Sequence, residues 1–105
     1  LLRRVSTKQE NIIHYKGIYV DMDKYKVFID NIEVTLTYKE FELLVFLLKH
    51  PKKVFTRSQL LSNIWGYDAD IFTRTVDSHI SSLRKKLEEK GEIIKSIPKI
   101  GYMVE

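Results

Sequence analysis

The segment RTVDSHISSLRKKLEEK, residues 74–90, has the clearest periodicity in this chain. Four apolar residues recur at helical spacing and form one stripe: Val76, Ile80, Leu83 and Leu87. The opposite face carries cations near its ends and small hydroxyl side chains between them: Arg74, Ser78, Ser81, Ser82 and Lys85. The spacing predicts a long helix with one packed side and one polar side that can approach a large surface closely. Taken alone, the pattern also fits an ordinary surface helix with a solvated face.

Short runs rich in β-branched and aromatic residues precede this helix. They lie at residues 12–15, 18–20, 26–29 and 32–36, separated by turn-forming residues. Asp30 and Asn31 suit a two-residue hairpin turn between the last two runs. We therefore expect a small antiparallel sheet of three or four strands at the start of the domain.

The segment after these strands predicts a buried helix. Thr37 and Glu40 match a capping box, in which each side chain bonds the backbone N–H of the other residue. The residues that follow, FELLVFLLKH, are apolar around nearly the whole helix, so we expect this helix at the centre of the core. Pro51 ends it.

A shorter helix is expected next. Thr56 begins a second capping box, and Gly66 stops the helix. Residues 66–73 then form a loop that is longer than most helix connections, and its Ile71 and Phe72 are expected to turn inward.

The chain closes with a predicted β-hairpin. Gly91 stops the long helix, and two strand-like runs at residues 93–97 and 101–104 follow it. The order of elements is therefore sheet, three helices and hairpin, which predicts an α+β winged helix-turn-helix. In that fold the second helix of the pair lies in the DNA major groove and the hairpin forms a wing.

Composition limits the class of protein. The 105 residues fit one domain, here residues 12–105, and the net charge of +4 favours an anionic partner. The absence of cysteine excludes disulfides and thiolate metal sites, and no signal peptide or membrane span is recognisable, so an intracellular protein is expected. The chain opens with Leu1 and not with Met, and LLRR reads as the end of an upstream helix, so we expect a piece of a longer protein.

Four segments in this order resemble the effector domain of OmpR/PhoB-type response regulators of two-component systems. They are LTYKEFELLVFLLKHP, FTRSQLLSNIWGYDAD, TRTVDSHISSLRKKLE and IKSIPKIGYMV, and the resemblance covers about residues 12–104. It implies a four-stranded sheet, three helices and a wing. It also implies sequence-specific binding to promoter DNA, with two copies head to tail on a direct repeat.

The same resemblance implies partners. Residues 1–11 resemble the end of a receiver domain and a linker, and a sensor kinase would phosphorylate that receiver in the cytoplasm. The loop at residues 66–73 occupies the position that meets RNA polymerase in this family, which assigns that contact to Tyr67, Asp68 and Asp70.

Site residues carry over position by position. The resemblance places Thr75 and Asp77 at base edges, although Asp77 near a helix start can also be structural. The residues at phosphate-holding positions are Trp65, Arg74, His79, Arg84 and Tyr102. The other residues expected to face DNA are Ser78, Ser82, Lys85 and Lys99.

Two positions depart from the family pattern. Ser82 stands where many members have a basic residue that binds bases, so it lacks bidentate contact with guanine. Pro98 and Lys99 replace the usual Arg-Gly of the wing tip. Our hypothesis is that Lys99 contributes phosphate contact more than base selection.

Other functions find less support in the sequence. The three histidines, His14, His50 and His79, lie far apart without metal-binding spacing, and no glycine-rich phosphate loop or catalytic triad is evident, so neither an enzyme nor a cofactor is expected. The aromatics Phe28, Phe41, Phe46, Phe55 and Trp65 are expected in the core. The serious alternative is a winged helix that binds protein, but the polar face of the long helix lacks the apolar anchors that such a surface needs.

Overall fold

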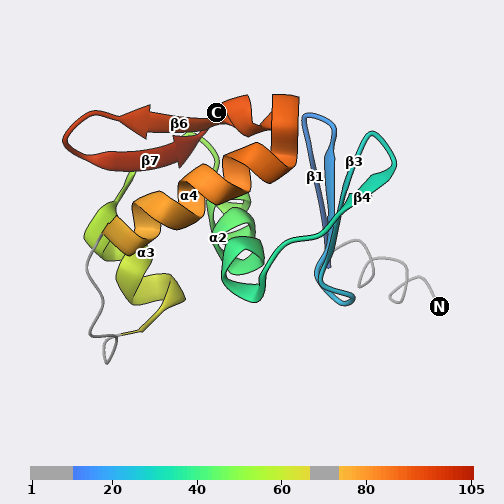
Figure 1. Ribbon diagram of the computed structural model, residues 1–105, viewed down its shortest axis with the longest axis horizontal. Coiled ribbons are helices and arrows are strands. Elements are labelled where there is room, and N and C mark those ends of the chain that lie inside the picture. The colour runs from blue at the N-terminus through green and yellow to red at the C-terminus, as the bar shows by residue number, and fades with distance from the viewer. Residues whose placement is uncertain (1–10, 67–73) are drawn as a thin grey trace.

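A computed structural model describes residues 11–66 and 74–105, and Figure 1 shows its elements. Four short antiparallel strands form the first sheet, in the order β1-β2-β3-β4. Their bounds are Ile12–Tyr15, Ile18–Asp21, Lys26–Ile29 and Ile32–Val34. The expected four-stranded sheet is confirmed, whereas the expected linker, except for Asn11, lies outside the described residues.

Alternation along these strands decides what the sheet buries. Ile18, Val20 and Val27 are at most 1% exposed and face the helices. Phe28 follows Val27 and therefore points to the other face, where its ring lies 6.1 Å from that of Tyr19. The prediction that Phe28 belongs to the core is wrong for this reason.

The turn between β3 and β4 is the predicted two-residue hairpin. Asp30 and Asn31 have φ angles of 50° and 70°, as a turn with both central residues in the left-handed region requires.

The central helix α2, Tyr38–Lys49, begins with the predicted capping box between Thr37 and Glu40. Leu43, Leu44 and Leu47 are fully buried, which confirms α2 as the core helix. The helix ends before Pro51, as the sequence predicts.

The short helix α3, Arg57–Ile64, follows a two-residue strand, β5, Phe55–Thr56. Its capping box between Thr56 and Gln59 is present as predicted, and Gly66 follows the helix with a φ of +93°. Strand β5 was not predicted.

The helix α4, Arg74–Leu87, packs its predicted stripe completely, because Val76, Ile80, Leu83 and Leu87 are all 0% exposed. In Figure 1 α4 crosses in front of α2 and begins near α3, and contacts join the three helices. The helix stops three residues earlier than predicted. Glu88, with a φ of +54°, starts the 3₁₀ helix η1, Glu88–Ile93, which turns the chain away.

Gly91 lies inside η1 and does not terminate α4 as expected. A Cβ atom at Gly91 would lie 2.7 Å from the carbonyl oxygen of Arg84, so glycine is needed for η1 to pack against α4. The close approach lets the chain turn directly from α4 into the wing.

The predicted C-terminal hairpin is present as β6, Ile94–Ile97, and β7, Gly101–Val104. Strand β5 joins it to give a three-stranded sheet in the order β5-β7-β6. A Cβ atom at Gly101 would lie 1.9 Å from the carbonyl oxygen of Phe55, so this pairing requires glycine there. The four-stranded sheet, the three helices and the hairpin together form the predicted winged helix-turn-helix. No helix in the described part of the chain is both long and apolar enough to cross a membrane.

Candidate nucleic-acid interface

The outer face of α4 is polar and open. Ser78, Ser81 and Lys85 are exposed, whereas Asp77 and Ser82 are half-buried. These five side chains line one shallow hollow along the helix. The stripe on the other side is fully buried, so the predicted division of α4 into a packed and a polar face is confirmed.

Two donors of the protein bind the half-buried carboxylate of Asp77. Its Oδ1 accepts a hydrogen bond of 2.7 Å from Arg57 Nε and one of 2.5 Å from the Tyr102 hydroxyl. Burial alone would raise the pKa of Asp77, but the bonds from Tyr102 and Arg57 outweigh it and lower that pKa. Asp77 thus ties the first turn of α4 to α3 and β7, which favours the structural role over base contact.

Tyr102 is buried, with 5% of its surface exposed. Burial first, and the neighbouring carboxylate of Asp77 second, raise the pKa of its hydroxyl. The guanidinium groups of Arg57 and Arg84 lie 5.4 Å and 5.6 Å from the centre of its ring. Tyr102 was expected to hold phosphate, but in this structure its hydroxyl hydrogen is given to Asp77.

Arg84 fastens the wing to α4. Its Nη2 donates to the Ile94 carbonyl and to the Ser96 hydroxyl, each at 2.8 Å, and its Nε donates to the same carbonyl at 3.2 Å. The Nη1 nitrogen takes no part in these bonds. Arg84 was expected to hold phosphate, and the structure adds a role in positioning β6.

Trp65 and His79, both expected to hold phosphate, lie together. Their rings are 4.9 Å apart and meet edge to face. The Nδ1 of His79 lies 2.9 Å from the Thr75 carbonyl oxygen. Because a carbonyl oxygen can only accept, Nδ1 carries a hydrogen and donates it to Thr75. Lys39 of α2 lies beside this pair. Its ammonium group is 5.8 Å from the centre of the Trp65 ring and donates to the Ile64 carbonyl at 2.8 Å.

A buried carboxylate lies under the middle of α4. Glu40 is 3% exposed, and its oxygens accept from Lys86 Nζ at 2.7 Å, from the Ser82 hydroxyl at 2.5 Å and from the Thr37 N–H at 2.9 Å. Burial would raise the pKa of Glu40, but these bonds, led by the one from Lys86, lower it to about 2. Glu40 is therefore ionised at neutral pH.

The position of Ser82 corrects the expectation that it lies simply on the outer face. Its hydroxyl turns toward Glu40 on α2, although the side chain also borders the outer hollow. The sequence showed Glu40 only as part of a capping box, because the tie to α4 joins residues more than forty positions apart. The one signal in the sequence for this buried carboxylate was an acidic residue at the start of a mostly apolar helix.

The remaining predicted residues are partly described. Thr75 is half-buried in the first turn of α4, and Lys99 is exposed at the wing tip with a φ of +64°. The side chain of Arg74 and the residues Tyr67, Asp68 and Asp70 lie outside the described part of the structure. Residues 11–66 and 74–105 contain no cluster of groups suited to hold a metal ion.

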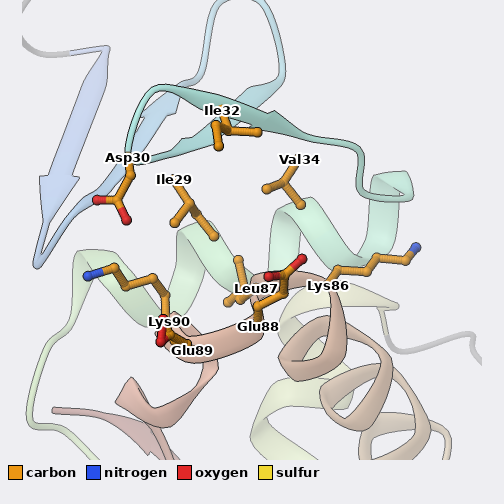
Figure 2. Close-up of a pocket in the computed structure, with 9 residues that line it drawn as sticks. All are labelled: Ile29, Asp30, Ile32, Val34, Lys86, Leu87, Glu88, Glu89 and Lys90. Carbon is orange, nitrogen blue, oxygen red and sulfur yellow. The ribbon is translucent and has the colours of Figure 1, made fainter.

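A separate hollow of about 190 Å³ lies between β3–β4 and the end of α4. Figure 2 shows Ile29, Ile32 and Val34 of the strands on one side, Leu87 across from them, and charged side chains of both signs around them. Because these charges are of both signs, this hollow shows no preference for an anionic ligand such as DNA.

Known proteins are similar to this chain in sequence and in fold. The family described as "Transcriptional regulatory protein, C terminal" matches residues 31–104. The transcriptional regulatory protein SrrA of Staphylococcus aureus is 42% identical over 99 residues, which cover 90% of this chain and 41% of SrrA. The chain therefore spans about two-fifths of the length of that relative.

Solved structures agree. The DNA-binding domain of the response regulator AdeR, in complex with an intercistronic region, superposes with a TM-score of 0.79 at 39% identity, covering 88% of this chain and 97% of that one. The RstA DNA-binding domain of Klebsiella pneumoniae, in complex with the RstA box, gives 0.79 at 30% identity, with coverage of 89% and 95%. DrrB, an OmpR/PhoB homologue of Thermotoga maritima, gives 0.81 at 31% identity, with coverage of 98% and 50%.

These relatives are transcriptional regulators and not enzymes. The superpositions show that this chain shares the fold of the AdeR and RstA DNA-binding domains. The chain belongs to the family of C-terminal domains of transcriptional regulatory proteins, in its OmpR/PhoB response-regulator branch.

Proposed function

We propose that this domain binds specific promoter sequences by placing α4 in the major groove. The observation that carries the proposal is the outer face of α4, where Ser78, Ser81 and Lys85 are exposed over an open hollow while the opposite stripe is fully buried. A major groove admits a helix with such a face. That two similar domains are described in complex with DNA supports the proposal.

Phosphate contacts would surround this helix. We assign them to Trp65, Arg74, Lys85 and Lys99, and to His79 when both of its ring nitrogens carry a hydrogen. The free Nη1 end of the Arg84 guanidinium can add one more, while its other nitrogens hold the wing. Thr75 and Ser78, near the start of α4, are then assigned to base edges; Ser78 is exposed and Thr75 is half-buried.

The remaining partners follow from the family. We propose that two copies bind head to tail on a direct repeat, and that a phosphorylated receiver domain upstream brings the two copies together in the cytoplasm. A sensor kinase would phosphorylate that receiver. Tyr67, Asp68 and Asp70 are proposed to contact RNA polymerase.

A fluorescence-anisotropy titration against a selected direct-repeat duplex and a scrambled duplex tests this function. We expect tighter binding to the repeat and a log–log salt slope on the order of −4 to −6 from released counterions. Lys85→Ala should weaken binding to both duplexes. Lys24→Ala is the matched control, because it removes the same charge from the exposed turn between β2 and β3.

Failure of this test has a definite meaning. Binding that shows neither salt dependence nor sequence preference would favour the alternative of a winged helix that binds protein. In that case the exposed stacked rings of Tyr25 and Tyr38, 5.8 Å apart, are the first surface to examine.

A further inference from the structure

Ser82 lies between two different environments. On one side its hydroxyl contacts the carboxylate of Glu40 on α2, at 2.5 Å. On the other side it borders the shallow hollow on the outer face of α4, together with Ser81 and Lys85. The residue therefore connects the buried interior with the surface that is proposed to face DNA.

The hydroxyl hydrogen of Ser82 is committed to the interior. Glu40 is ionised, and an ionised carboxylate can only accept hydrogen bonds. The hydrogen in the contact between the two residues therefore belongs to Ser82 and points toward Glu40. Because Glu40 is 3% exposed, water cannot easily replace this donor, and rotation of the hydroxyl would remove one of the bonds that stabilise a buried charge.

What remains on Ser82 for a ligand is a lone pair. A hydroxyl oxygen that has donated its hydrogen can still accept one. Phosphate oxygens are acceptors, as are N7 and O6 of guanine, O4 of thymine and N7 of adenine in the major groove. None of these groups can form a hydrogen bond with Ser82 in this arrangement. The donors at base edges in the major groove are the amino groups of cytosine and adenine.

Resting on the proposed function, we propose that Ser82 accepts a hydrogen bond from the amino group of a cytosine or an adenine, and so specifies an amino-bearing base at one position of the DNA site. Glu40 is the positioning residue, because it fixes the direction of the Ser82 hydroxyl without facing the hollow itself. Lys86 helps to hold Glu40 in place through the second carboxylate oxygen.

Ser81 provides a matched control on the same helix. It is exposed, it borders the same hollow, and it takes no part in the bonds to Glu40. Its hydroxyl can therefore rotate to donate or accept, and it should not impose one kind of base. A difference between Ser81 and Ser82 thus tests the fixed hydroxyl and not the mere presence of serine.

The first experiment selects binding sites from randomised duplexes with the unmodified domain, Ser82→Ala and Ser81→Ala. We expect Ser82→Ala to abolish the base preference at one position of the selected site, and the adenine or cytosine of that base pair is then the candidate donor. Ser81→Ala should keep that preference. Ser82→Arg should move it to guanine, because a guanidinium donates to both O6 and N7.

The second experiment removes only the amino group. Anisotropy titrations compare the selected duplex with one in which purine replaces adenine, or pyrimidin-2-one replaces cytosine, at that position. The unmodified domain should lose about tenfold in affinity, the size of one poor base contact. Ser82→Ala should bind both duplexes equally. Ser82→Thr, which keeps the hydroxyl, should behave like the unmodified domain and shows that the loss does not come from misfolding.

The outcomes separate the two proposals. Equal binding of the unmodified domain to the duplex without the amino group, or loss of the same base preference in Ser81→Ala, overturns the role of Ser82 while sequence-specific binding stands. If the unmodified domain prefers no duplex over a scrambled one, the proposed function fails, and the role of Ser82 fails with it.

Discussion

The Tyr102 hydroxyl donates a hydrogen bond to Oδ1 of Asp77, and this bond joins the last strand of the wing to the first turn of α4. Both residues were expected to touch DNA, one at a base and one at a phosphate. In this structure the Tyr102 hydroxyl and Oδ1 of Asp77 bond each other. The wing and α4 therefore form one preassembled surface. A substitution at Tyr102 or at Asp77 should alter the position of both the wing and the helix.

Tyr102→Phe tests this bond. The change removes the hydroxyl and keeps the ring near the two arginines. We therefore expect the free energy of unfolding to fall by about 1–3 kcal/mol, the value of a hydrogen bond to a charged group. Urea denaturation measures it. Tyr19→Phe, on the outer face of the four-stranded sheet, should change stability by less than about 0.5 kcal/mol. Equal effects of the two changes would show that the hydroxyl of Tyr102 contributes nothing specific.

Glu40 should make stability depend on acid pH. Its folded-state pKa of about 2 lies below the ordinary value of 4.5, so its contribution is complete above pH 4.5 and disappears as the pH falls toward 2. We expect this contribution to be about 1–3 kcal/mol, because the partly exposed Lys86 is screened by solvent. Glu40→Gln should flatten the curve of stability against pH in this range.

The control for that experiment is Glu33→Gln. Glu33 forms an exposed pair with Lys26 at 4.0 Å, and such pairs contribute little to stability. Its curve should follow that of the unmodified protein. A parallel curve for Glu40→Gln would contradict the role assigned to the buried carboxylate.

Two glycine substitutions separate crowding from backbone strain. In Gly101→Ala the new methyl group meets the Phe55 carbonyl at 1.9 Å, so β5 must move and stability should fall by about 2–3 kcal/mol or more. In Gly66→Ala no atom of residues 11–66 and 74–105 lies within 4 Å of the new methyl group, but the φ of +93° is strained, and about 1 kcal/mol is expected. Thermal unfolding ranks the two, and the opposite ranking would be inconsistent with the β5–β7 pairing.

Arg84→Ala should loosen the wing. Hydrogen exchange of the backbone amides in β6 should rise, because Arg84 no longer bonds the Ile94 carbonyl and the Ser96 hydroxyl. Arg84→Lys should not restore protection, since a single ammonium group cannot replace the planar fork of donors. Lys85→Ala serves as the comparison and should weaken DNA binding without changing exchange in β6.

Lys99→Ala tests the contribution of the wing tip to DNA binding. If Lys99 contacts phosphate, the change should weaken binding to all duplexes about equally and reduce the salt slope by about one. Titrations with duplexes that differ only in an A/T-rich flank provide the measurement. A loss of preference for that flank would instead assign base selection to Lys99.

The local features of the fold could be predicted from the sequence because their signals lie within a few residues. The two capping boxes, the buried stripe of α4 and the Asp30–Asn31 turn are of this kind. Strand β5 was missed because two residues carry no periodicity, and only its partner β7 defines it. The end of α4 was misplaced because Glu88, and not a glycine, takes the left-handed conformation.

The residues of the candidate site could be predicted from the sequence, but their geometry could be predicted only in part. The sequence identified the polar face of α4, but it could not show that Asp77 bonds Tyr102 or that Ser82 bonds Glu40, because these partners are 25 and 42 positions apart. Long-range pairs of this kind depend on how the helices pack. They decide which polar atoms remain available to a ligand.

Strand β5 has a mechanical consequence. Thr56 both pairs with Gly101 of the wing and caps the first turn of α3, so no flexible residue separates the wing from that helix. A duplex that pulls on the wing would transmit the load straight into α3, and through Arg57 and Asp77 into α4. The domain should therefore bind DNA as one rigid body, in which the wing does not move independently of the helices.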